Sequence, residues 1–562
     1  MFNSKQEKLF TVPEKDGKIA FTKNAFVQSA IKQSAETISG NGALKYSSTN
    51  NYFIDQFGQI GSYKTPRTYK DISNDVATIW TRNPYTTLCL IFFIRMITRI
   101  TSLFDGSKTS SVQKGSGLKH EGIVRMMWVS INYPDVFWKN ISLFISIGSW
   151  KDIIMMLSYD LQYNGWKNRV LSWDNFGKLL LAGLENPNTS ELIKKYLPQI
   201  KANSKCKTLE SQADNIIAKW VCSLLFGNKS GDTAYYNYKK YRKLKSSGTA
   251  HQWQKLISQG KHNLIDFNTI HGRALAQLVS GKYLNNNGLE QKYQEWIEKK
   301  PIAKYTGYVH ELAHSIRSAT KKYQIDTINA QYKQLLELAG KTNSNFIVVK
   351  DTSTSMNSPA FGTNMSSYEI AKAISIYLAN LLKGRFHNHY IDFSSKAILR
   401  EVKGSTFVEH WNTETRVASA DTNFLAVADI FISVKNQNIE ESEFPSGIIC
   451  ISDGEFNRVG MFKITNIEAF RLKLENAGFS RNFINNFKFC FWDIRNTFYG
   501  HISSVKFETF NNHNNVYYFS GYDPSVITFL TGVENKEKPI PKNAEELFSS
   551  AMDQEIMHLI EI

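Results

Sequence analysis

Apolar residues recur at three- and four-residue spacing from about residue 40 to residue 335. The clearest stretches are TYKDISNDVATIWTRNPYTTLCLIFFIRMITRI, HEGIVRMMWVSINYP, FWKNISLFISIGSWKDIIMMLSYDLQ and SQADNIIAKWVCSLLF. This spacing is typical of amphipathic α-helices, and short Gly, Pro and Asn segments separate one helix from the next. Consecutive helices of this kind predict a helical-repeat or bundle architecture, although no repeat period is clean enough to choose between them.

The rhythm changes after about residue 340. Short apolar runs rich in β-branched and aromatic residues appear there, namely NFIVVK, SGIICIS, FKFCFWDI and NVYYFS. They alternate with the helical stretches SSYEIAKAISIYLANLLKG and NFLAVADIFISVKN. Nearly continuous apolar strands that alternate with helices predict a mostly parallel sheet covered on both faces, an α/β Rossmann-like fold. The tail NAEELFSSAMDQEIMHLIEI predicts an amphipathic helix that docks back onto the protein.

A chain of 562 residues exceeds the size at which a single core keeps growing, so several domains are expected. The change of rhythm divides it into four predicted segments: an N-terminal arm over 1–36, an all-α domain over 37–340, an α/β domain over 341–535 and a C-terminal helix over 536–562.

The cysteines and the apolar runs indicate the cellular compartment of the protein and whether the chain crosses a membrane. The five cysteines are scattered and form no C-x-x-C, which favours a reducing compartment over a disulfide framework. The N-terminus has no secretory h-region, and the longest apolar run, LCLIFFI, stops at Arg95, far short of the roughly 20 residues of a membrane span. We expect a cytoplasmic protein that does not cross a membrane.

The net charge of +17 is unevenly distributed. Residues 1–340 carry 46 Lys and Arg against 25 Asp and Glu, whereas residues 341–562 carry 21 against 25. The whole positive excess therefore belongs to the helical half. Such an asymmetry indicates the kind of partner rather than the fold, and a polyanion is the obvious one.

Polar side chains follow the first predicted strand at spacing two. Asp351, Ser353 and Ser355 come directly after NFIVVK, Thr422 precedes a predicted helix, and Asp453 follows the strand SGIICIS. Carboxylates and hydroxyls at the carboxyl ends of parallel strands are suited to Mg²⁺ or another hard divalent cation. The plainer alternative is a polar turn that caps the next helix.

The three pieces DTSTS, DTN and ISDGEF resemble the metal-ion-dependent adhesion site (MIDAS) of von Willebrand factor A (vWA) domains. The resemblance implies that Ser353, Ser355 and Thr422 provide hydroxyls, while Asp351 and Asp453 bind the cation directly or through water. It also implies an open coordination position that accepts an acidic group from a protein partner. That role is binding and not catalysis.

A basic segment with interleaved tyrosines, YYNYKKYRKLKSSGTAHQWQKLISQGKH, predicts contact with RNA. Cations neutralise phosphates, and the rings of Tyr238 and Tyr241 are candidates to stack on unpaired bases. The alternative is a solvated helix face whose tyrosines pack in the core. The candidate phosphate-binding residues are Lys239, Lys240, Arg242, Lys243 and Lys245. A second basic patch comprises Lys194, Lys195, Lys201, Lys205 and Lys207.

The order of segments resembles the TROVE module of the Ro autoantigen family, a ring of HEAT-like helical repeats followed by a vWA domain. It is more similar still to vWA-containing relatives found in plants and large viruses. The likeness is carried by GNGALKYSSTNNYFIDQF, SIGSWKDIIMML, YRKLKSSGTAHQW, FWDIRNT and VYYFSGYDPSVITFL. It implies binding of small structured RNAs on the ring's outer surface and of single-stranded ends in its central hole, and a virus-encoded chain is compatible with it. FFIRMITRITSLFDGSK lacks the expected Gly-rich segment, so individual RNA contacts are not transferred.

A rival motif lies in YVHELAHSI, where His310, Glu311 and His314 form H-E-x-x-H. On a helix the two histidines could bind Zn²⁺ with Glu311 as general base of a peptidase. No third histidine follows at the metzincin spacing, and surface or capping histidines are the preferred interpretation.

Together these observations predict a ribonucleoprotein component that binds RNA and does not turn over a substrate. A protein-interaction module without RNA is the alternative, and a zinc metallopeptidase is the third candidate.

Overall fold

The computed structural model describes most of the chain between residues 36 and 562. The described residues are 36–38, 44–46, 51–59, 67–102, 110–228, 231–247, 252–270, 272–280, 283–299, 305, 307–339, 345–360, 363–382, 384–454, 456–457, 465–494, 515–522 and 544–562. The predicted arm, 1–36, lies outside them except for Glu36.

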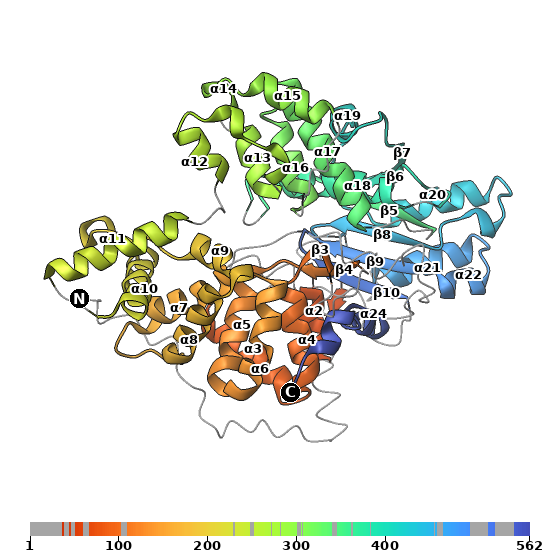
Figure 1. Ribbon diagram of the computed structural model, residues 1–562. Helices are drawn as coiled ribbons and strands as arrows, with labels where there is room; N and C mark the ends of the chain where they lie inside the picture. Colours follow the sequence, from red (N-terminus) through yellow and green to blue (C-terminus); the bar gives the residue numbers. More distant parts are fainter. Residues whose placement is uncertain are drawn as a thin grey trace.

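Helices dominate the first half of the chain, as predicted (Figure 1). Proline at the first helical position begins three of them, where its fixed φ and missing N–H cost nothing. Within the described residues, no helix combines the length and apolarity that crossing a membrane would need. The helices are α2 (Tyr52–Gln59), α3 (Tyr69–Trp80), α4 (Pro84–Arg95), α5 (Lys119–Asn132), α6 (Pro134–Ile147), α7 (Trp150–Asn164), α8 (Trp173–Glu185), α9 (Pro187–Tyr196), α10 (Leu209–Phe226), α11 (Gly231–Ser247), α12 (Gln252–Ser258), α13 (Gly272–Ser280), α14 (Tyr283–Asn286), α15 (Glu290–Glu298), α16 (Val309–Ile316) and α17 (Lys322–Ala339).

Two short antiparallel hairpins interrupt the helical half. The first pairs β1 (Glu36–Ile38) with β2 (Leu44–Tyr46), and the second pairs β3 (Ile97–Ser102) with β4 (Ser110–Ser116). The prediction that the helix continues through MITRI is therefore wrong, because α4 ends at Arg95. Four of the six residues of ITRITS are β-branched, which favours a strand over a helix there.

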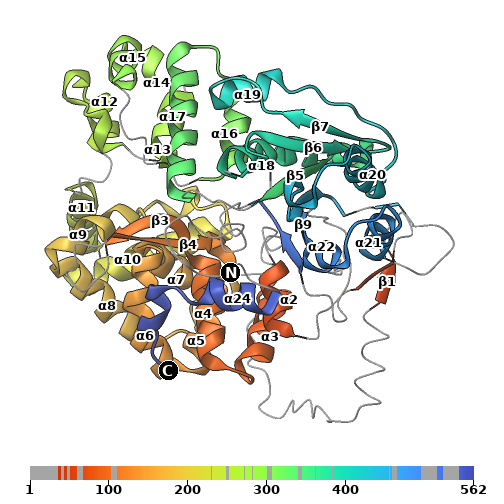
Figure 2. The same ribbon diagram turned by 90° about the vertical axis from the view of Figure 1, so that its right-hand side faces the viewer.

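A six-stranded sheet forms the C-terminal half, in the order β10-β9-β8-β5-β6-β7 (Figures 1 and 2). All neighbours are parallel except β7, which is antiparallel to β6 at the edge. The predicted fold class, an all-α region followed by an α/β region with a mostly parallel sheet, is confirmed. The ring implied by the resemblance stays a prediction. The elements are β5 (Phe346–Asp351), β6 (His389–Phe393), β7 (Ala397–Glu401), β8 (Gly447–Ser452), β9 (Lys488–Asp493), β10 (Val516–Ser520), α18 (Ser367–Leu381), α19 (Phe407–Thr413), α20 (Leu425–Lys435), α21 (Asn466–Asn476) and α22 (Arg481–Asn486).

Both faces of the sheet are buried, and the strands divide their residues between two apolar clusters. In β5, Phe346 and Val348 join the cluster that also contains α18, while Ile347 and Val349 join the cluster with α20 and α21. Side chains alternate between the two faces of a strand, so a strand covered on both sides reads as a continuous apolar run. This is why NFIVVK and SGIICIS were recognisable in the sequence.

The two halves share one hydrophobic core. The larger apolar cluster includes residues of α2 to α11, of α16 and α17, and of one face of the sheet. At residue 340, where the sequence predicts a domain boundary, α17 packs against α19, and the Tyr332 ring stacks on Phe407 with centroids 4.2 Å apart. A smaller separate cluster holds α12 to α15 together.

The C-terminal segment docks onto the helical half, as predicted. It forms α24 (Ala544–Met552) and a short 3-10 helix (Glu555–Leu559), a shorter helix than the predicted 536–562. α24 lies beside α2 and α4, almost the whole sequence away (Figures 1 and 2). Gln554 exchanges two 2.9 Å hydrogen bonds with the backbone of Lys114, and Asn140 bonds the backbone of Glu561.

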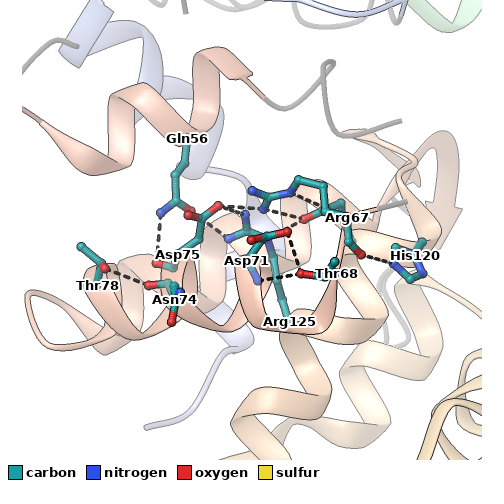
Figure 3. A network of polar contacts seen from close by, with 10 residues as sticks. Gln56, Arg67, Thr68, Asp71, Asn74, Asp75, Thr78, His120 and Arg125 are labelled. Atoms are coloured by element: carbon teal, nitrogen blue, oxygen red, sulfur yellow. Dashed lines mark hydrogen bonds and ion pairs between the residues drawn. The ribbon is translucent and has the colours of Figure 1, made fainter. Parts of the chain in front are cut away.

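A buried polar network ties α2, α3 and α5 together (Figure 3). The guanidinium of Arg67 bonds Asp75 at 2.7 Å and Glu121 at 2.9 Å. Arg125, fully buried, donates to Gln56 at 2.8 Å and pairs with Glu121 at 3.3 Å. Removing Glu121 would take from the fully buried Arg125 its nearest ionic partner, so this network fixes the packing of the first helices.

Candidate cation site and candidate nucleic-acid interface

The predicted cation loop lies at the carboxyl edge of the sheet. Asp351 ends β5, and Asp453 follows the end of the neighbouring strand β8. Asp351, Ser353, Thr422 and Asp453 are all at most 1% exposed, and Ser355 is half-buried. The parallel sheet places the ends of its strands at one edge, so the pieces at the ends of β5 and β8 are brought together as the sequence predicts.

Hydrogen bonds hold the loop in a defined shape. The carboxylate of Asp351 accepts one bond from the Ser353 amide at 2.8 Å and one from the Ser452 hydroxyl at 2.6 Å. The loop that carries Thr422 is tied to it, because the backbone and hydroxyl of Thr354 both donate to the carbonyl of Ser419 at 2.9 Å. Hydrogen bonds from the end of β8 and from the loop that carries Thr422 therefore both hold the turn after β5 in place.

The donor set fits a small hard cation. The hydroxyls of Ser353 and Ser355 are hydrogen-bonded to each other, with their oxygens 3.0 Å apart. Neighbouring ligands in an octahedron with bonds of 2.0–2.1 Å, the geometry of Mg²⁺, are about 2.8–3.0 Å apart, so the two oxygens could occupy adjacent positions. Burial, and then the charge of Asp453, raise the pKa of Asp351 to about 7, since two carboxylates here share a desolvated space. A divalent cation would compensate that charge.

An arginine that the sequence analysis missed braces the loop. The guanidinium of Arg416 donates to the carbonyl of Thr352 at 3.0 Å and to that of Ser353 at 2.6 Å, and it also bonds the side chain of Asn357. It lies 4.0 Å from the Tyr368 ring. No motif marks this position. The only signal is its place in TETRVASADTN, just upstream of Thr422.

A buried ion cluster lies directly beneath the cation loop. Lys350, the residue before Asp351, is fully buried and pairs with Asp392 at 3.2 Å and with Glu414. The Tyr368 hydroxyl also donates to Glu414, at 2.7 Å. Lys350, which ends the apolar run of β5, thus supports the cation loop from beneath. Its ion pairs join β5 to β6 and to the segment that carries Arg416.

The candidate RNA-binding segment forms α11, and the helix has an inner and an outer side. Asn237 and Tyr241 are buried, one turn apart, whereas Lys239, Lys240, Arg242 and Lys243 are exposed. None of these four cations forms an ion pair with another residue that the structure describes. Their charges face solvent and are available to a phosphate backbone.

Two of the predicted RNA contacts need correction. Tyr241 is fully buried and its hydroxyl donates to the carbonyl of Pro198 at 2.9 Å, so the prediction that its ring stacks on bases is wrong. Lys245 is partly buried, with its ammonium 3.4 Å from the Lys195 carbonyl, and burial lowers its pKa. Tyr238 is half-buried against the core.

The exposed rings of α11 are Tyr235 and Tyr236, at 62% and 58%. The ammonium of Lys240 lies 4.6 Å from the Tyr236 ring centroid. Ala234, Tyr238, Tyr241 and Leu244 recur at helical spacing, and this periodicity is the signal for which tyrosines face outward.

The second basic patch adjoins the first. α11 packs against α9, where Lys195 sits 5.3 Å from the Tyr196 ring and Lys194 pairs with Glu191 at 3.0 Å. The bond from Tyr241 to Pro198 fixes α11 against the start of the next segment. That segment then carries three exposed lysines, Lys201, Lys205 and Lys207. Two basic stretches about 40 residues apart in the sequence are thus joined by the packing of α11 on α9.

The H-E-x-x-H residues have separate surroundings. His310 is buried between the rings of Tyr308 and Tyr522, whereas His314 is exposed. The carboxylate of Glu311 caps its own helix, accepting from the Tyr308 amide at 3.2 Å and the Tyr305 hydroxyl at 3.0 Å. The expectation of two surface or capping histidines is wrong for His310. Within the described residues, no three His, Cys, Asp or Glu side chains gather as metal ligands.

Comparisons with known proteins add three findings. Residues 345–557 match a family described as a domain of unknown function (DUF7788), and this segment contains all five candidate cation ligands. The chain is similar to the uncharacterised protein L728 of Acanthamoeba polyphaga mimivirus, with 20% identity over 446 residues that cover 70% of this chain and 74% of that protein. This confirms the expectation of a relative in a large virus.

Among solved structures, the Ro (RSR) protein of Deinococcus radiodurans aligns with 90% of this chain and 99% of its own. The TM-score is 0.34 and the sequence identity 8%. Every residue role considered below therefore comes from the residues of this chain.

Proposed function

We propose that the protein is an RNA-binding ribonucleoprotein component without catalytic turnover. RNA would bind the surface formed by α9, residues 201–207 and the outer side of α11, referred to below as the basic surface. The observation that carries the proposal is the meeting of two basic segments there, in the half of the chain that holds the entire positive excess. Phosphate neutralisation by such cations supplies most of the non-specific affinity for nucleic acids.

The exposed tyrosines indicate which RNA suits this surface. Tyr235 and Tyr236 present ring faces beside Lys239 and Lys240, and unpaired bases stack on such rings while phosphates meet the cations. Bases in a duplex are already stacked and cannot use them. We therefore infer single-stranded ends, or loops of small structured RNAs, as the preferred ligand.

The cation loop would serve a separate purpose, the capture of a protein partner. Ser353, Ser355 and Thr422 would offer hydroxyls to Mg²⁺, with Asp351 and Asp453 bound directly or through water. An ion held by these groups supplies a Lewis-acidic position for an acidic side chain of the partner. The 3.0 Å spacing of the two serine hydroxyls supports this part of the proposal.

The proposal that the protein binds RNA is tested by titrating the full chain into a labelled unstructured RNA over a range of salt concentrations. We expect tight binding near physiological salt, with log affinity falling linearly with log salt concentration. Neutralising Lys239, Lys240, Arg242 and Lys243 together should weaken binding of every RNA. A wild-type chain that ignores RNA at physiological salt would overturn the proposal and leave the protein-interaction alternative in first place.

The proposal that the loop binds a cation is tested by thermal unfolding with and without Mg²⁺ or Mn²⁺. Wild type should gain stability with the ion, because a ligand that binds only the folded state raises the unfolding free energy. Asp351→Ala should lose that gain and leave RNA affinity unchanged, whereas Glu440→Ala, which removes an exposed carboxylate elsewhere in the same half, should keep it. The absence of a shift in wild type would reduce the site to a capped turn.

A further inference from the structure

The connection between α7 and α8 presents an exposed tryptophan covered by an arginine. Trp166 is 40% exposed, and the guanidinium of Arg169 lies 3.8 Å from its ring centroid. Lys167, between them, is also exposed. An indole face with two neighbouring cations has the same chemistry as the outer side of α11, although the two segments are more than 60 residues apart in the sequence.

This connection is firmly shaped by one buried carboxylate. Asp160 is fully buried and accepts hydrogen bonds from the amides of Val170 and Leu171 at 3.1 and 3.2 Å. It also accepts from the indole N–H of Trp173 at 2.8 Å and from Asn164 at 3.0 Å. A buried charge is costly unless it is fully bonded, so these partners fix the path of the connection. Trp166 is therefore displayed by a rigid support.

The tryptophan and the basic surface rest on the same helix. The Trp166 ring meets Trp173 at 5.2 Å, and Trp173 meets Trp220 of α10 at 4.7 Å. Further along α10, Phe226 lies 5.9 Å from the ammonium of Lys240, and its carbonyl accepts from Asn237 of α11 at 3.0 Å. The C-terminal half of α10 thus supports both features, and α8 and α11 both lie beside this helix (Figure 1).

Packing in the hydrophobic core does not explain why the indole of Trp166 is exposed. Trp173 is itself 4% exposed and satisfied by Asp160, and Trp166 keeps two fifths of its surface in solvent. The exposed groups are an aromatic plane and two cations, Lys167 and Arg169. Charge complementarity favours a polyanion, and the flat ring favours one that carries planar groups of its own.

We propose that Trp166 and Arg169 form a second RNA contact, which takes an unpaired base of a strand that also meets the basic surface. The base would stack on the indole face that Arg169 now covers, while the guanidinium and Lys167 turn to the flanking phosphates. This inference rests on the proposed function, because the second contact would extend the surface along which a single RNA strand binds. It predicts that longer single strands bind more tightly than short ones until both features are reached.

The test uses the full chain, labelled single-stranded RNAs of increasing length, and a duplex of the same length. Trp166→Ala should weaken binding of long single strands about tenfold and leave duplex binding unchanged. Trp166→Phe should restore most of the affinity, since it keeps a ring. Arg169→Gln should flatten the salt dependence by about 0.7 units. Tyr283→Ala removes a 53%-exposed ring of α14 and serves as the matched control, with no expected effect.

The outcomes separate the two proposals. If the basic-surface variant loses RNA while Trp166→Ala, with an unchanged melting temperature, binds long single strands like wild type, the inference falls and the proposed function stands. If wild type binds no RNA, both fall. If poly-glutamate competes as well as single-stranded RNA of equal charge, the surface recognises charge alone and base stacking on Trp166 is refuted.

Discussion

The cation loop and the outer side of α11 are opposite kinds of site. At the loop four of the five candidate ligands are buried, and hydrogen bonds fix the turn, as the two bonds to Asp351 and the bond from Arg416 to Ser353 illustrate. On α11 the candidate contacts are exposed, and four cations have no ion-pair partner among the described residues. The loop holds its polar side chains in one fixed arrangement, as our proposal of a single bound cation requires. The helix offers charge and ring faces to a large, flexible ligand.

This difference predicts different responses to mutation. A change in the loop disturbs a buried network and should alter stability and cation binding together. A change on the outer side of α11 removes exposed groups that lie outside the core and should alter affinity with the fold intact.

The largest effect should come from neutralising Lys239, Lys240, Arg242 and Lys243 to alanine. Each lost phosphate contact lowers the salt slope by about 0.7 units on single strands, and together they should weaken binding on the order of 100-fold. The measurement is fluorescence anisotropy with labelled RNA. As a matched control, neutralising the exposed Arg385, Lys396, Lys403 and Arg481 of the α/β half should change affinity little. Equal losses in both variants would contradict a localised interface.

Next comes the replacement of Tyr235 and Tyr236 by alanine. Stacking is worth about 1–3 kcal/mol per base, so affinity for single strands should fall about tenfold or more while duplex affinity stays nearly constant. Tyr241→Phe, which removes only the buried bond to Pro198, should instead cost about 1 kcal/mol of unfolding free energy and leave RNA affinity alone. A loss of RNA binding in Tyr241→Phe alone would reverse the assignment of inner and outer tyrosines.

The pH dependence of stability should report on the loop. Because the pKa of Asp351 is raised from 3.8 to about 7, the folded protein holds its proton where the unfolded chain has lost it. With divalent ions chelated, the unfolding free energy should therefore fall as pH rises from about 4 to about 7, by at most about 1.4 kcal/mol per pH unit from this group. Asp351→Asn should remove that fall, and Glu440→Gln should keep it. An identical profile in wild type and Asp351→Asn would contradict the burial of this carboxylate.

The smallest effect concerns Glu311. Its replacement by alanine removes the acceptor of the Tyr308 amide and should lower the unfolding free energy by about 1 kcal/mol, measured by denaturant titration. His314→Ala, at an exposed position, should change stability little. We also expect less than stoichiometric zinc after dialysis. Tightly held zinc that is lost in His310→Ala would promote the metallopeptidase alternative.

Sequence reasoning worked best where topology leaves little choice. The strands β5, β8, β9 and β10 read as continuous apolar runs because both faces are covered, and the polar residues after β5 and β8 had to meet at one edge. The hairpin of β6 and β7 was missed, since β7 is largely exposed and its apolar run, Ala397 to Leu399, is only three residues long.

The remaining gaps concern relations between distant segments. Arg416 braces the loop through backbone carbonyls, which any sequence could supply, so its spacing carries no signature. The hydrophobic core that the two halves share depends on how α17 packs against α19, and amino-acid composition does not predict how two distant helices pack. For α11 the helical phase was readable, and weighing the apolar stripe would have placed Tyr241 inside.

The most direct test of the account is to map ultraviolet cross-links between the full chain and a single-stranded RNA by mass spectrometry. The account predicts that the cross-linked peptides come from residues 161–173, 187–207 and 231–247, with Tyr235, Tyr236 and Trp166 as the attached residues. Cross-links concentrated in 345–494, around the cation loop, would contradict the assignment of RNA to the helical half.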